Sequence, residues 1–195
     1  TLKAEKRSMD VKAKRLRREG YVTGNVFGKK IQGSIPVKME KKDVDRLLKT
    51  ETKGGQIMLD VEGEVYDVLI KEVDYDAMAN QVVEIDFQAL VSNEKVHSVA
   101  EIVLHNTENV VEGVLEQILK EVSYKAYPSA LVDKIDVDCG NLHLGDCIRV
   151  KDLEIAKNKD ISIMTNPESI IVNVIAVHNN AGDDTADDTE ETAEK

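Results

Sequence analysis

The chain has 195 residues, of which 42% are hydrophobic and 32% charged, a composition typical of a soluble globular protein. No apolar run approaches the ~20 residues that span a bilayer, and two cysteines are too few for a disulfide scaffold. We therefore expect a cytoplasmic protein that does not bind membranes.

The first 92 residues predict short strands and two short helices. Period-two alternation on both sides of Glu62-Gly63 predicts a hairpin, and Gly20 is a suitable residue to end a basic helix. Pro36 places its strand at an edge or an end, because proline has no backbone donor. The predicted elements are an edge strand at 2–7, a helix at 12–19, strands at 22–27 and 31–38, a helix at 41–50, hairpin strands at 57–61 and 65–73, and a strand at 82–90.

Ser92-Asn93-Glu94 is the predicted boundary between an N-terminal domain at 1–92 and a second β-rich domain at 93–178. Residues 110–123 also fit a helix, but their β-branched content favours strands. The other strands predicted in this domain are at 96–104, 135–138, 147–150, 161–164 and 170–177. Residues 179–195 are acidic and hold no large apolar side chain, which predicts a disordered tail. The fold class is thus mainly β with short helices.

Positive charge is concentrated at the start of the chain. Residues 1–30 carry ten Lys or Arg and three acids, a net charge of +7. The three remaining segments, 31–93, 94–178 and 179–195, each carry a net charge of −6. Screening confines surface charges to a range of roughly 10 Å at ordinary salt, so a local basic surface can bind a polyanion on an acidic protein.

Several motifs occur in an order that resembles the long, two-domain form of the bacterial large-subunit ribosomal protein twenty-five family, which includes the general stress protein Ctc. They extend from residue 2 to about residue 177. The motifs are Leu2-Lys3-Ala4-Glu5-Lys6-Arg7, Lys14-Arg15-Leu16-Arg17-Arg18-Glu19-Gly20, Val26-Phe27-Gly28, Glu84-Ile85-Asp86-Phe87, Gly113-Val114-Leu115, Asp136-Val137-Asp138, Leu144-Gly145-Asp146, Val150-Lys151-Asp152-Leu153 and Asn166-Pro167-Glu168.

The resemblance implies a β-barrel-like N-terminal domain that binds 5S ribosomal RNA in the large subunit. It also implies a separate β-rich domain, which we expect to contact neighbouring ribosomal proteins. Basic side chains neutralise phosphates, and duplex RNA is recognised largely by its shape, so a protein with few aromatic residues suits a duplex. Carried over by position, the RNA-binding residues are Arg7, Lys14, Arg15, Arg17, Phe27, Gly28, Lys29 and Lys71.

Two segments and two single residues depart from the family pattern. Thr23-Gly24-Asn25 replaces a Pro-Ala-apolar segment, Tyr75-Asp76 replaces a basic stretch, and Glu84 replaces a histidine. Phe27 also stands where the family has tyrosine, which removes a hydroxyl. The carboxylates motivate an alternative function, a stress-related protein-interaction module with reduced or lost RNA affinity.

Catalytic and metal-binding motifs are weak. Cys139, His143 and Cys147 have ligand-like spacing, but a structural zinc site requires a fourth ligand. We find no nucleophile with its base and no phosphate-binding loop. The sequence therefore predicts a protein that is not an enzyme and has neither metal nor cofactor.

Overall fold

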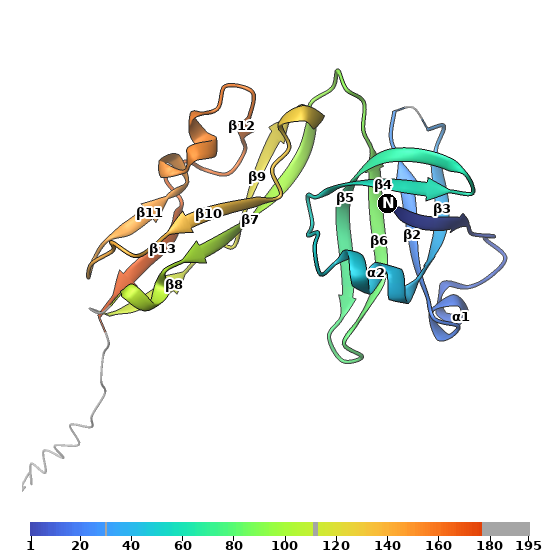
Figure 1. Ribbon diagram of the computed structural model, residues 1–195, viewed down its shortest axis with the longest axis horizontal. Coiled ribbons are helices and arrows are strands. Elements are labelled where there is room, and N and C mark those ends of the chain that lie inside the picture. The colour runs from blue at the N-terminus through green and yellow to red at the C-terminus, as the bar shows by residue number, and fades with distance from the viewer. Residues whose placement is uncertain (30, 111–112, 177–195) are drawn as a thin grey trace, which may run out of the picture.

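The computed structural model describes residues 1–29, 31–110 and 113–176 and confirms the mainly β fold with short helices (Figure 1). A closed barrel of six strands is followed by two further sheets. None of the helices within the described ranges is long and apolar enough to span a membrane. The predicted tail at 179–195 lies outside the described residues.

The strands of the barrel follow the order β1-β3-β2-β6-β5-β4. The pairs β1–β4 and β2–β6 are parallel, and the other strand pairs are antiparallel. The elements of this region are β1 (Leu2–Lys6), α1 (Ala13–Arg18), β2 (Tyr21–Phe27), β3 (Ser34–Glu40), α2 (Lys41–Leu47), β4 (Gln56–Val61), β5 (Glu64–Asp76) and β6 (Gln81–Ala89).

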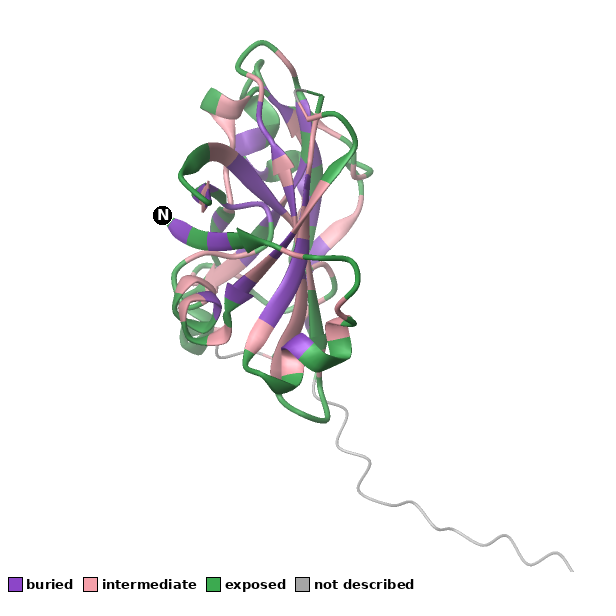
Figure 2. Ribbon diagram, turned by 90° about the vertical axis from the view of Figure 1, so that its right-hand side faces the viewer, coloured by how far each residue is buried: buried purple, intermediate pink, exposed green. Residues whose placement is uncertain are grey.

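The barrel interior follows from the period-two pattern of its strands, because successive side chains of a strand point to opposite faces. On β6, Ile85 and Phe87 are fully buried, whereas Glu84 and Asp86, which alternate with them, are partly exposed. Figure 2 shows buried segments along the strands, interrupted by intermediate and exposed ones. The outward-facing side chains of β6 are only partly exposed, and Thr23 on the outward face of β2 is fully buried.

Barrel closure corrects one prediction. Residues 2–7 were expected to form an edge strand, but β1 pairs with β3 on one side and with β4 on the other. A closed barrel has no edges, and the alternation of a short strand does not reveal how many neighbours it has. Pro36 lies inside β3, one residue beyond the β1–β3 ladder, where its carbonyl accepts a bond from the Arg7 backbone N–H.

The predicted hairpin is confirmed. The β4 and β5 strands pair up to Val61 and Glu64, and the two turn residues between them, Glu62 and Gly63, have φ values of 53° and 95°. Positive φ at both central residues matches the right-handed twist of the flanking strands.

The second domain contains a four-stranded sheet in the order β10-β7-β9-β12 and a three-stranded sheet in the order β11-β13-β8. The preference for strands over a helix in residues 110–123 is confirmed by β8 and β9, with residues 111–112 outside the described ranges. The strands are β7 (Val96–His105), β8 (Val114–Gln117), β9 (Glu121–Ala126), β10 (Lys134–Asp138), β11 (Cys147–Arg149), β12 (Ser162–Ile163) and β13 (Ile170–Ile175).

A small cluster of apolar side chains joins the two parts of the chain. Leu69 of β5, Leu90 and Val96 form a buried group, and Leu131 packs against it. The larger cores lie on either side, one built from residues of the barrel and the other from residues 100–172. The domain boundary at residues 92–93 remains a prediction.

Candidate nucleic-acid interface

Helix α1 presents its basic side chains on two different sides. Leu16 is only 6% exposed and packs the helix against the barrel. Each residue of an α-helix is turned by about 100° from the previous one. Lys14 and Arg18 are turned by about 200° from Leu16, and Arg15 and Arg17 are turned by about 100° in opposite directions. Lys14, Arg15 and Arg18 are exposed, whereas Arg17 lies on the flank that contacts β6 and is partly buried. The outer side of α1 is a compact basic surface.

Arg17 is held against β6. Its Nε donates a hydrogen bond to the carbonyl oxygen of Val83 at 3.2 Å. One of its terminal nitrogens lies 3.5 Å from a carboxylate oxygen of Glu84, and both side chains are about one third exposed, at 33% and 32%. This predicted RNA-binding residue is thus in contact with one of the unexpected carboxylates.

Two other predicted residues near α1 have local partners. Arg15 forms an ion pair with Glu19 one turn later at 2.9 Å, but 75% of its side chain is exposed. Arg7 donates from a terminal nitrogen to the Val11 carbonyl at 3.2 Å, and its Nε is buried with no hydrogen-bond partner among the described residues. An exposed ion pair contributes little, so Arg15 remains accessible to an anion.

Phe27, Gly28 and Lys29 lie at the end of β2 that is farther from α1 along the chain, and the strand extends roughly 20 Å at the usual rise per residue. Lys29 forms an ion pair with Glu94. A side chain at Gly28 would place its Cβ 2.9 Å from that of Ala89, so the glycine permits close packing against the end of β6. The structure therefore separates these three residues from the basic surface of α1.

Lys71 lies at the junction between the barrel and the second domain. Its Nζ donates a hydrogen bond to the carbonyl oxygen of His97 at 2.9 Å. Burial lowers the pKa of Lys71, and nearby Lys53 lowers it further. Burial also lowers the pKa of His97, as do Lys125 and Lys71. This lysine connects β5 to β7 and does not join the cations of α1.

Carboxylates occupy the outer face of β5 and β6. Asp74 lies opposite Glu84 in the ladder, and Glu72 lies opposite Asp86. Asp86 accepts hydrogen bonds from the backbone and side-chain nitrogens of Asn25 at 3.2 and 3.4 Å. The barrel thus has a basic side at α1 and an acidic side at β5–β6.

Lys12 and Arg18 were not among the predicted site residues, although both are exposed. No carboxylate of the described residues lies within ion-pair distance of either one, or of Lys14. The helical period was the signal that could have identified Arg18. A residue two positions after buried Leu16 is turned by about 200° and faces away from the barrel.

The Cys-His-Cys pattern does not form a cluster. Cys139 is buried, whereas Cys147 and His143 are exposed, and no group of three metal-ligating side chains occurs in the described part of the chain. Burial raises the pKa of the Cys139 thiol, and Asp138 raises it further. This is the behaviour of a small apolar core residue.

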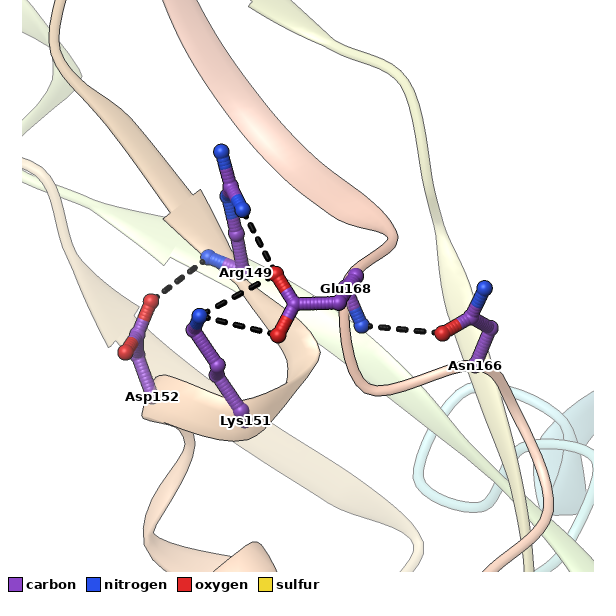
Figure 3. A network of polar contacts seen from close by, with 5 residues as sticks. All are labelled: Arg149, Lys151, Asp152, Asn166 and Glu168. Carbon is purple, nitrogen blue, oxygen red and sulfur yellow. Dashed lines mark hydrogen bonds and ion pairs between the residues drawn. The ribbon is translucent and has the colours of Figure 1, made fainter.

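In a second group of charged side chains, the members form hydrogen bonds and ion pairs with one another (Figure 3). Arg149 and Lys151 both bind the Glu168 carboxylate, at 2.6 and 2.9 Å. Asp152 accepts from the Arg149 backbone N–H, and Asn166 accepts from that of Glu168. The group joins β11 to the turn before β13, which is a structural role.

Comparison with known proteins gives a consistent result along the chain. Residues 2–87 match the ribosomal L25p family, and residues 95–178 match the C-terminal domain of ribosomal protein TL5. The large ribosomal subunit protein bL25 of Carboxydothermus hydrogenoformans is 32% identical over 164 residues, which are 83% of this chain and 81% of that protein. The bL25 protein of Bacillus pumilus is 30% identical over 90% of this chain and 85% of its own. That of Caldanaerobacter subterraneus subsp. tengcongensis is 27% identical over 100% of this chain and 98% of its own.

Proposed function

The chain belongs to the ribosomal L25p family, and from this we propose that it is a cytoplasmic component of the large ribosomal subunit that binds 5S ribosomal RNA without performing chemistry. The relatives are named as large-subunit proteins. The identity of the RNA follows from the resemblance of the N-terminal motifs. The second domain would then contact neighbouring ribosomal proteins.

The observation that carries this proposal is the outer side of α1. Lys14, Arg15 and Arg18 are exposed side by side on one helix, while the rest of the chain is acidic. All three arginines of the helix lie in its last turn, where the partial negative charge of the helix end favours cations. Leu16 fixes the helix on the rigid barrel, so the cations are held in place before RNA arrives.

The proposed mode of binding is recognition of duplex shape. Each cation that approaches a phosphate releases condensed counterions, which makes affinity fall steeply with salt. The outer faces of β2 and α1 carry two aromatic side chains, Tyr21 and Phe27, and both are half-buried. Stacking of unpaired bases requires a larger aromatic platform, so a paired region of the RNA fits this surface better.

The test is an electrophoretic shift assay with 5S ribosomal RNA and an unrelated duplex of equal length. We expect tighter binding of the 5S RNA at moderate salt. Reversing two charges with Lys14→Glu and Arg18→Glu should weaken binding to every RNA by at least about tenfold and reduce the salt slope by roughly two. The matched control is Lys42→Glu with Lys49→Glu, two exposed lysines in and just after α2. Equal binding of both RNAs would contradict the proposal.

A second function is favoured by the acidic side of the barrel. The carboxylates of β5 and β6 suit a basic protein partner better than RNA, and they support a protein-interaction module with the same fold. Sedimentation distinguishes the two functions. A protein that is absent from purified large subunits under all growth conditions would favour the interaction module.

A further inference from the structure

The guanidinium group of Arg17 has one anchor that is built into the fold and one that is exchangeable. Its Nε donates to the backbone carbonyl of Val83, and this bond fixes where the side chain lies across β6. Its terminal nitrogen faces the carboxylate of the next residue, Glu84, with about one third of each side chain exposed. The first contact positions Arg17, and the second occupies the group that could bind an anion.

A carboxylate and a phosphate are equivalent acceptors for arginine, since both accept charge-assisted hydrogen bonds from the same planar fork. We propose, on the basis of the proposed RNA-binding function, that Glu84 sets the affinity of the site. Its carboxylate occupies Arg17 when RNA is absent and competes with an RNA phosphate for it. Glu84 also marks the border of the RNA contact surface on the β6 side.

The fold gains little from a carboxylate at this position. The pair is partly exposed, and such pairs contribute only weakly to stability. Asp74 lies directly opposite Glu84 on β5, and like charges opposite each other in an antiparallel ladder are unfavourable. The larger effect of Glu84 is therefore on an approaching anion.

This arrangement predicts where the RNA lies. Phosphates bind over the outer side of α1, where Lys14 and Arg18 are exposed, and they are repelled from the face that carries Glu84 and Asp74. Arg17 stands at the border between the two surfaces. It contributes fully to binding only after it is released from Glu84.

The test is Glu84→Gln, which removes the charge and keeps the size of the side chain. The matched control is Glu116→Gln, an exposed glutamate on β8 in the second domain that gives the same change in net charge. We expect Glu84→Gln to bind duplex RNA about threefold to tenfold more tightly at moderate salt, with a salt slope steeper by about one. The RNA affinity of the control should differ from that of the unchanged protein by less than about twofold, because screening limits the effect of a surface charge to roughly 10 Å.

A double-substitution cycle separates this role from a merely structural one. In an Arg17→Gln background the gain in RNA affinity from Glu84→Gln should be smaller, because the guanidinium group that Glu84 would release is no longer present. An equal gain in both backgrounds, or equal affinities of Glu84→Gln and Glu116→Gln, would overturn the inference.

The outcomes also distinguish this inference from the proposed function. Tighter binding of Glu84→Gln to all duplexes, without preference for 5S RNA, would support the inference and contradict the proposed function. If the protein prefers 5S RNA but Glu84→Gln does not bind RNA more tightly, the proposed function would be supported and the inference contradicted. No binding of any RNA by any variant would reject both.

Discussion

Arg17 and Arg18 are neighbours in the sequence, but the helix turns them to different environments. Arg17 lies across β6 with its nitrogens on Val83 and Glu84, whereas Arg18 is exposed. A basic run is therefore not a list of equivalent contacts. The side of the helix on which each residue lies decides whether its charge is available to a partner.

The variants Arg18→Gln and Lys29→Gln test which end of the barrel binds RNA. Arg18 lies on the outer side of α1, but Lys29 lies at the far end of β2 and pairs with Glu94. We expect Arg18→Gln to weaken RNA binding by roughly threefold to tenfold and Lys29→Gln by less than about twofold. Filter-binding titrations at two salt concentrations would measure both. A larger loss from Lys29→Gln would show that the RNA contacts the other end of the barrel.

The two cysteines differ in burial, which predicts that thiol reagents modify them at different rates. Cys147 is exposed, while Cys139 is buried and its pKa is raised by burial. The thiolate is the reactive form, so at neutral pH a thiol reagent should modify Cys147 quickly and Cys139 only after unfolding. Mass spectrometry of the native and denatured protein would count the labels. Rapid double labelling of the native protein would contradict the burial of Cys139.

At the scale of elements, α1 depends on the barrel for its existence. It has six residues, no side-chain cap and no acidic residue in its first turn, and helices this short are unstable alone. Burial of Leu16 supplies the missing stabilisation. The basic surface is thus organised by the burial of Leu16 and by the contacts of Arg17 with Val83 and Glu84.

The polar group around Glu168 yields a prediction about pH. Hydrogen bonding to Lys151, followed by that to Arg149, lowers the pKa of Glu168 below its ordinary value of 4.5. A carboxyl group with a lowered folded-state pKa contributes stability above its unfolded pKa and loses it as pH falls through the folded pKa. Glu168→Gln should therefore lower the Tm slightly at pH 7, and the difference should vanish as the pH falls below 4.5.

Thermal unfolding followed by circular dichroism at several pH values would measure this difference. The control is Glu154→Gln, an exposed glutamate of the second domain in the 3-10 helix Glu154–Lys157. A Tm difference for Glu168→Gln that is the same at pH 3 and pH 7 would mean that the ion pairs of Figure 3 do not stabilise the fold.

At the scale of the whole molecule, the loop before β4 packs against β7. Gly54 has a φ of 90°, and a Cβ there would lie 2.0 Å from the carbonyl oxygen of Val99. Ser98, which is buried, directs its hydroxyl to the Gly54 carbonyl at 3.4 Å. Together with Lys71 and the apolar cluster at Leu90, these contacts hold the second domain at a set position on the barrel.

Gly54→Ala should separate the two domains. The control is Gly63→Ala, since Gly63 has a similar φ of 95° but a Cβ added there would meet no atom within 4 Å. Both variants should lose about 1 kcal/mol of stability from the left-handed conformation. Only Gly54→Ala should increase the radius of gyration in small-angle X-ray scattering. An unchanged scattering profile for Gly54→Ala would show that the junction does not depend on this contact.

Local features of this protein could be predicted from its amino-acid sequence. Period-two alternation located the strands, Glu62-Gly63 located the hairpin turn, and the basic run located α1. These features follow from preferences that act over a few neighbouring residues. The order of the family motifs along the chain carried the identification of the family.

The neighbours of each charged group depend on how distant segments pack together. Closure of the barrel gave β1 two partners where an edge strand was expected, and it brought Arg17 to Val83, 66 residues away. Packing of β7 against the barrel brought Lys71 to His97 at the domain junction. Charge and hydrophobicity are properties of single residues, but ion pairing depends on distances between segments that meet only after folding.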